Sequence, residues 1–112
     1  MSLLEPVKLV LVFVNETDRW NDMPLHHAIV QRLRQLDIAG ATAHVGFLGF
    51  GHHKRLHHKG LLGISDDRPV TIMAIDEERK IRAVLPELRE MVLEGLIVVL
   101  QAELIADQPP RP

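Results

Sequence analysis

The stretch Val7-Lys-Leu-Val-Leu-Val-Phe-Val14 decides the fold class, because it is short, rich in β-branched residues and followed by a polar cluster. It predicts a strand over 7–14 whose alternating positions are almost all apolar, so that both of its faces avoid water. The run LIVVLQAELI predicts a second such strand over 96–105, apolar on both faces over 96–100. These two strands begin and end the expected domain.

The first half of the chain is predicted to form a strand, a helix and a second strand. Leucine and isoleucine at helical spacing predict a helix with its N-cap at Asn21 or Asp22, Pro24 in its first turn and its end near Leu36. A second strand is expected over 41–51, weakened by glycines. A long polar and basic loop, 52–69, follows it and is the kind of segment that carries function.

The second half repeats the pattern. A strand is expected over 70–75 and a helix capped by Asp76, with Pro86 breaking or kinking it at Leu85 and Gly95 ending it. The order βαββαβ predicts an α+β, ferredoxin-like sandwich, with a four-stranded antiparallel sheet and two helices on one face. We expect one domain over 1–105, followed by a proline-rich, flexible tail over 106–112.

Two helices cover only one face of such a sheet. The other face would expose a large apolar patch on a monomer, since the first and last strands are apolar on both sides. We therefore predict a homo-oligomer in which the open sheet faces pack together.

The composition of the chain excludes several classes of partner and of catalysis. The 112 residues carry a net charge of −2, so no nucleic-acid partner is expected, and no apolar run is long enough for membrane insertion. Cysteine is absent, which excludes disulfides and thiol catalysis, and no secretory signal is visible, so we expect a cytoplasmic protein. No nucleophile lies in a recognisable catalytic pattern, and we predict that the chain is not an enzyme.

Two segments could bind a ligand. Just before the long loop, Gly49 and Gly51 would let backbone N–H groups approach an anion, with Arg55 and His57 of the loop supplying positive charge. A second candidate is the segment Glu16-Thr-Asp18-Arg19-Trp20, which follows the first strand, where ligand sites often form. The alternative is that Asp18 and Arg19 pair locally and that Trp20 packs under the start of the helix. The loop also has four clustered imidazoles that suit Zn or Cu, at His52, His53, His57 and His58. A solvated polar loop remains the plain alternative.

Several motifs together resemble a known family. They are NETDRW at 15–20, PLHHAIV at 24–30, GATAHVG at 40–46, GFG at 49–51, LH at 56–57, ISDDRPV at 64–70, LPELREMV at 85–92 and EGLI at 94–97. Their order and spacing over about residues 5–105 resemble the uncharacterised PII-like family, number 190 of the domains of unknown function.

The resemblance implies a PII-like homotrimer that acts in signalling or regulation. It implies an adenine nucleotide bound between subunits at the base of the loop, which places Gly49, Gly51, Arg55 and His57 there, and a protein partner, a transporter or an enzyme, reached by loop 52–69. Asp18 and Arg19 belong to the family's own motif. The absence of tyrosine excludes nucleotidylation on tyrosine. The copper-tolerance family shares the trimeric fold, which keeps divalent-metal binding as the alternative. A third hypothesis is a trimer with a purely structural role, in which the loop is incidental.

Overall fold

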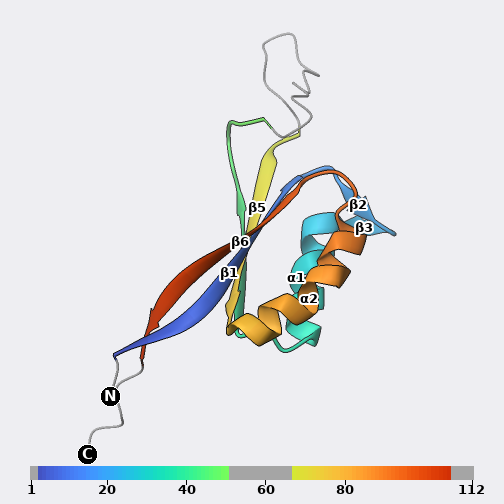
Figure 1. Cartoon of the computed structure of the whole chain (residues 1–112). Helices are drawn as coiled ribbons and strands as arrows, with labels where there is room; N and C mark the ends of the chain where they lie inside the picture. Colours follow the sequence, from blue (N-terminus) through green and yellow to red (C-terminus); the bar gives the residue numbers. More distant parts are fainter. Residues whose placement is uncertain (1–2, 51–66, 107–112) are drawn as a thin grey trace, which may run out of the picture.

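The computed structural model describes residues 3–50 and 67–106. Its main sheet has four antiparallel strands, in the order β4-β5-β1-β6, and helices α1 and α2 lie together on one side of it (Figure 1). The strands are β1 (Leu4–Asn15), β4 (Gly40–Val45), β5 (Pro69–Asp76) and β6 (Leu96–Ile105). The helices are α1 (Leu25–Gln35) and α2 (Glu78–Met91), which confirms the predicted ferredoxin-like fold. None of the described helices is long and apolar enough to cross a membrane.

A small hairpin that the sequence did not predict precedes α1. Its strands are β2 (Arg19–Trp20) and β3 (Met23–Pro24), and Asn21 turns between them with a positive φ of 55°. Asparagine tolerates that conformation better than most residues. The predicted N-cap at Asn21 or Asp22 is therefore wrong: Pro24 occupies the N-cap position and the helix begins at Leu25.

Other predicted boundaries also differ from the structure. The second strand ends at Val45 rather than at residue 51, and the structure describes residues 46–50 without a strand. Helix α2 continues through Pro86 instead of breaking at Leu85. It begins after Glu77 rather than directly after Asp76, and it ends at Met91, well before Gly95.

Gly95 has another role, in the turn that leads into β6. Its φ of 146° is unfavourable for a side chain, and an added Cβ would collide with the carbonyl oxygen of Phe13. The glycine thus lets β6 begin against the end of β1, where Phe13 pairs with Leu96.

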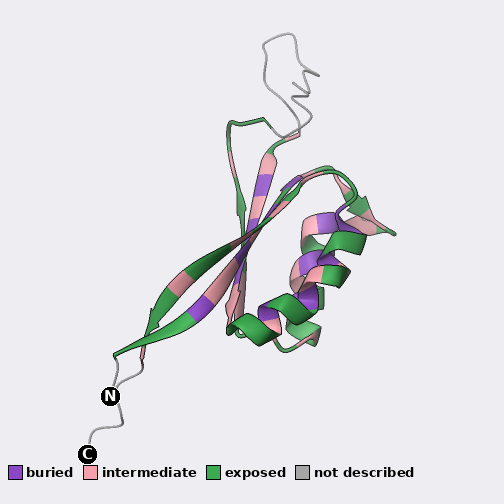
Figure 2. Ribbon diagram, viewed as in Figure 1, coloured by how far each residue is buried: buried purple, intermediate pink, exposed green. Residues whose placement is uncertain are grey.

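The core lies between the helices and one face of the sheet. β1 turns three valines toward it, β5 contributes two aliphatic residues and an alanine, and both helices add apolar side chains (Figure 2). The sheet residues of this core are Val10, Val12, Val14, Val70, Ile72 and Ala74, all at most 5% exposed.

The opposite side of the sheet carries no helix, and we call it the open face. It is defined by residues that alternate with the core positions and pair with one another across β5, β1 and β6. These residues are Leu9, Leu11, Phe13, Met73, Ile75, Leu96, Val98 and Leu100. Met73, Leu96 and Leu100 are each 40–45% exposed, so the single chain leaves an apolar sheet surface in water.

Candidate functional site

The end of β1 lies beside the start of β5, the strand that follows the long loop. We call this junction the loop base. Asn15 pairs with Pro69 at the end of the ladder. Beyond it, the Glu16 N–H donates to the carbonyl oxygen of Arg68 at 2.8 Å, and the Thr17 N–H donates to Oδ1 of Asp67 at 3.1 Å. The segments NETDRW and ISDDRPV, about fifty residues apart, are thereby joined at one edge of the sheet.

A bidentate ion pair reinforces this junction. The Arg68 guanidinium donates through Nε and Nη2 to the two carboxylate oxygens of Glu16, at 3.0 and 2.8 Å. This hydrogen bonding holds the pKa of Glu16 below its ordinary value and raises the pKa of Arg68. Half of the Arg68 side chain stays exposed, so the guanidinium is held by protein on one side and open to solvent on the other.

Asp18 accepts hydrogen bonds from two backbone N–H groups. Its Oδ2 accepts the Asn15 N–H at 2.9 Å, and its carbonyl oxygen accepts the N–H of Leu25 at 2.8 Å. This residue therefore ties the end of β1 to the first residue of α1. Arg19 also bonds locally, because Nη2 donates to the carbonyl oxygen of Asp22 at 2.7 Å inside the β2–β3 hairpin.

Gly49 lies at the same junction. A Cβ on Gly49 would stand 3.1 Å from Cγ of Pro69, and one on Gly46 would meet the same atom at the same distance. The Gly46 N–H also donates to the Pro69 carbonyl oxygen at 2.7 Å. The chain entering the loop thus passes closely over the start of β5. Between and after these glycines, Phe47, Leu48 and Phe50 are 71–90% exposed.

The other predicted site residues cannot be placed. Gly51, Arg55 and His57, and the histidines at 52, 53 and 58, lie outside the described residues. Within residues 3–50 and 67–106, no three side chains of the metal-binding types come together. At the described part of the loop base, the acidic groups Glu16, Asp18 and Asp67 outnumber the guanidinium groups of Arg19 and Arg68. Binding of an anion there therefore needs further positive charge from outside this set.

Sequence reasoning missed Arg68 and Asp67 as partners of the segment 16–17. A signal for them was present: NETDRW directly follows the first strand, and the Asp-Asp-Arg run directly precedes the third. Antiparallel pairing of those two strands brings the two segments together.

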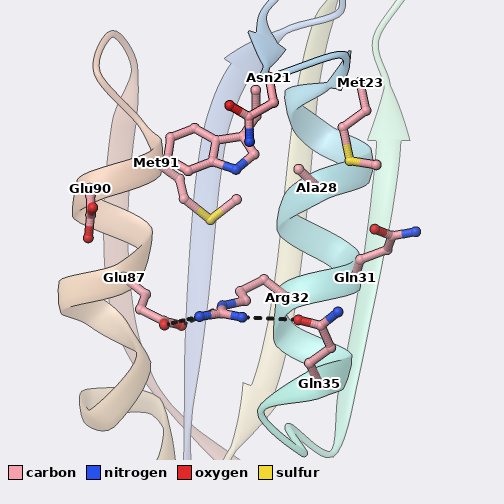
Figure 3. Close-up of a pocket in the computed structure, with 10 residues that line it drawn as sticks. Asn21, Met23, Ala28, Gln31, Arg32, Gln35, Glu87, Glu90 and Met91 are labelled. Carbon is pink, nitrogen blue, oxygen red and sulfur yellow. Dashed lines mark hydrogen bonds and ion pairs between the residues drawn. The ribbon is translucent and has the colours of Figure 1, made fainter.

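A pocket of about 410 Å³ lies away from the loop base, between α1 and α2 (Figure 3). The β2–β3 hairpin contributes Trp20, Asn21 and Met23 to it, and the helices contribute the rest. Arg32 of α1 spans the gap to Glu87 of α2, with hydrogen bonds of 2.6 and 3.0 Å. Of the residues lining this pocket, only Trp20 belongs to a segment that the sequence analysis considered as a candidate site.

Comparisons with known proteins agree with this architecture. The model of the DUF190 family, described as "Uncharacterized ACR, COG1993", matches residues 7–104. A UPF0166 protein of Aquifex aeolicus is 29% identical over 98 residues, which cover 88% of this chain and 92% of the relative. A UPF0166 protein of Methanocaldococcus jannaschii is 29% identical over 93 residues, covering 82% and 85%.

Solved structures show the same fold at low identity. CPII, a nitrogen regulatory PII-like protein from Thiomonas intermedia bound to ADP, AMP and bicarbonate, is 18% identical, with a TM-score of 0.66 and 92% of each chain covered. A putative PII-like signaling protein from Thermus thermophilus is 15% identical, with a TM-score of 0.55, covering 90% of this chain and 89% of its own. The chain therefore belongs to the DUF190 family and has the PII-like, ferredoxin-like fold.

Proposed function

We propose that this chain is a PII-like regulatory protein without enzymatic activity, and that it works as a homotrimer. The observation that carries the proposal is the open face. It adjoins the loop base, because strands β1 and β5 contribute to both. Covering that face with further copies would remove its apolar side chains from water. It would also set the loop base of one copy beside its neighbour, which creates a cleft between subunits.

The ligand of that cleft, in this proposal, is an adenine nucleotide. Structural neighbours such as CPII bind ADP and AMP, which supports the choice of ligand class. The described residues of one chain give too little positive charge for phosphate, so the cleft would need Arg55 and His57 or a group from the neighbouring subunit. Because Gly49 and Gly51 have no side chain, they would leave room for the ligand next to the backbone.

Arg68 is the residue we expect to respond. Its guanidinium is held by Glu16 but half exposed, and a phosphate oxygen could replace the carboxylate as its acceptor. Exchange of that partner would loosen the junction between β1 and β5 and shift the population of loop conformations. Loop 52–69, in its ligand-dependent conformation, would then bind a protein partner such as a transporter or an enzyme.

The experiment is a titration of the purified chain with ATP, ADP and AMP, read by calorimetry and thermal unfolding. A ligand at about 100 times its Kd stabilises the folded state by about 2.7 kcal/mol per site. We expect Arg68→Ala and Arg55→Ala to weaken nucleotide binding and Glu16→Gln, which frees Arg68, to strengthen it. Arg79→Ala is the matched control, because Arg79 forms an exposed pair with Glu77 elsewhere.

Two results would contradict the proposal. If ATP, ADP and AMP give no heat of binding and do not change the unfolding temperature, an adenine nucleotide is not the ligand. Stabilisation only by Zn or Cu, abolished by His53→Ala or His57→Ala, would instead favour the divalent-metal function of the histidine-rich loop.

A further inference from the structure

The pocket between α1 and α2 is built differently from the loop base. Its volume of about 410 Å³ lies within the range of pockets that bind small molecules. Residues of α1 and α2 line it, and both helices lie on one side of the sheet, opposite the open face (Figure 1). A ligand could therefore enter it even when the open face is covered by other copies.

The apolar part of the pocket has an aromatic ring and two thioethers. Trp20 packs against the core while remaining partly exposed, and Met23, Met91 and Ala28 line the same pocket (Figure 3). Methionine side chains adapt readily to flat or irregular apolar ligands. This part therefore suits a flat apolar group.

The charged part of the pocket is acidic. Arg32 is already satisfied, because it donates to both carboxylate oxygens of Glu87 and, at 3.1 Å, to Oε1 of Gln35. The bonds to Glu87 raise the pKa of Arg32 and keep it charged. Glu90 also lines the pocket, is exposed, and contributes through its charge to the raised pKa of Arg32. The charged groups lining the pocket are therefore two carboxylates and one guanidinium, which leaves one net negative charge.

We propose that this pocket binds a small organic cation, an ammonium or guanidinium group attached to a flat apolar body. The apolar body lies against Trp20 and the two methionines, and the cation pairs with Glu90. Cations are also attracted to the face of a tryptophan ring, which adds to the same preference. An anionic ligand would meet the Glu90 and Glu87 carboxylates and is disfavoured, so the pocket is distinct from the proposed nucleotide site.

The test uses the fluorescence of Trp20, which is the single tryptophan of the chain. The probes are phenethylamine, 2-phenylethanol and 3-phenylpropanoate, which share a phenyl body and carry positive, neutral and negative ends. We expect a saturable change of emission with phenethylamine, at least fivefold weaker binding of the neutral probe, and no binding of the anion. Glu90→Gln should reduce the preference for the cation at least fivefold, whereas Glu103→Gln, at an exposed position on β6, should preserve it.

Glu90 is exposed, so its substitution should leave the fold intact, which the unfolding temperature checks. The proposal fails if phenethylamine gives no saturable change, if the three probes bind equally, or if Glu90→Gln leaves the preference unchanged. Nucleotide binding in the Glu90→Gln variant should equal that of the natural chain, so failure here is distinguishable from failure of the regulatory proposal.

Discussion

The two faces of the sheet have similar sequences and different surroundings. On β5, Ile72 is fully buried under the helices, whereas the adjacent Met73 on the open face is 40% exposed. On β1, Val12 and Phe13 differ in the same way, at 0% and 36%. Both faces are apolar, but one chain provides helices for only one of them. This difference is the basis of the proposal that the open face contacts other copies of the chain.

The largest effect is expected from truncating the helix-covered face. Ile72→Ala removes a fully buried side chain, so it should lower the free energy of unfolding by about 2–5 kcal/mol. The loss should appear at every protein concentration in urea unfolding, because it arises within one chain.

The neighbouring substitution Met73→Ala sharpens the contrast. Its cost should grow with protein concentration, because association would bury the 40% of this residue that one chain leaves exposed. A cost of Met73→Ala that is the same at low and high concentration would break the comparison between the two faces.

Introducing a charge on the open face tests association itself. Leu11 lies between Met73 and Val98, and Leu11→Glu would bury an unpaired carboxylate in any contact between sheets. The penalty of about 3–5 kcal/mol per buried charge should dissociate the assembly. Light scattering after size exclusion measures this, and Ala83→Glu on the exposed side of α2 should leave the mass unchanged.

A smaller effect is expected from removing the backbone hydrogen bonds that the Asp76 carboxylate accepts. Oδ2 of Asp76 accepts the Ala39 N–H at 2.9 Å and Oδ1 accepts the Glu77 N–H at 2.7 Å. Burial raises the pKa of Asp76, but these bonds and Lys80 outweigh it, and the pKa lies below its ordinary value. Asp76→Ala should cost about 1–3 kcal/mol in urea unfolding. An unfolding free energy equal to that of the natural chain would show that water replaces the carboxylate.

The smallest effect is the acid sensitivity of the loop base. Because Arg68 lowers the pKa of Glu16 in the folded state, this pair stabilises the fold above the unfolded pKa near 4.5 and loses that contribution as the pH falls. The unfolding temperature of Glu16→Gln should therefore fall less steeply below pH 4.5 than that of the natural chain. Identical slopes would contradict the role of this pair.

The sequence predicts the fold well for a physical reason. The segments 7–14 and 96–100 are almost entirely apolar, and the repeated βαβ order leaves few topologies. The open face could be predicted too, because two helices cannot cover both sides of four strands.

The local details depend on contacts that a sequence pattern does not contain. The β2–β3 hairpin has two residues in each strand, and Asp18 supports it through a bond to the first residue of α1. The pair Glu16–Arg68 joins residues 52 apart and requires the register of β1 on β5. The pocket between the helices arises from their packing, which places Trp20 beside residues of both helices.

The molecular mass of the natural chain in solution tests the central claim most directly. Sedimentation equilibrium at micromolar concentration should give about three times the 12.7 kDa of one chain, with the open faces covered. A mass equal to one chain at all concentrations would contradict the account, because the open face would then remain in water and no cleft between subunits could form.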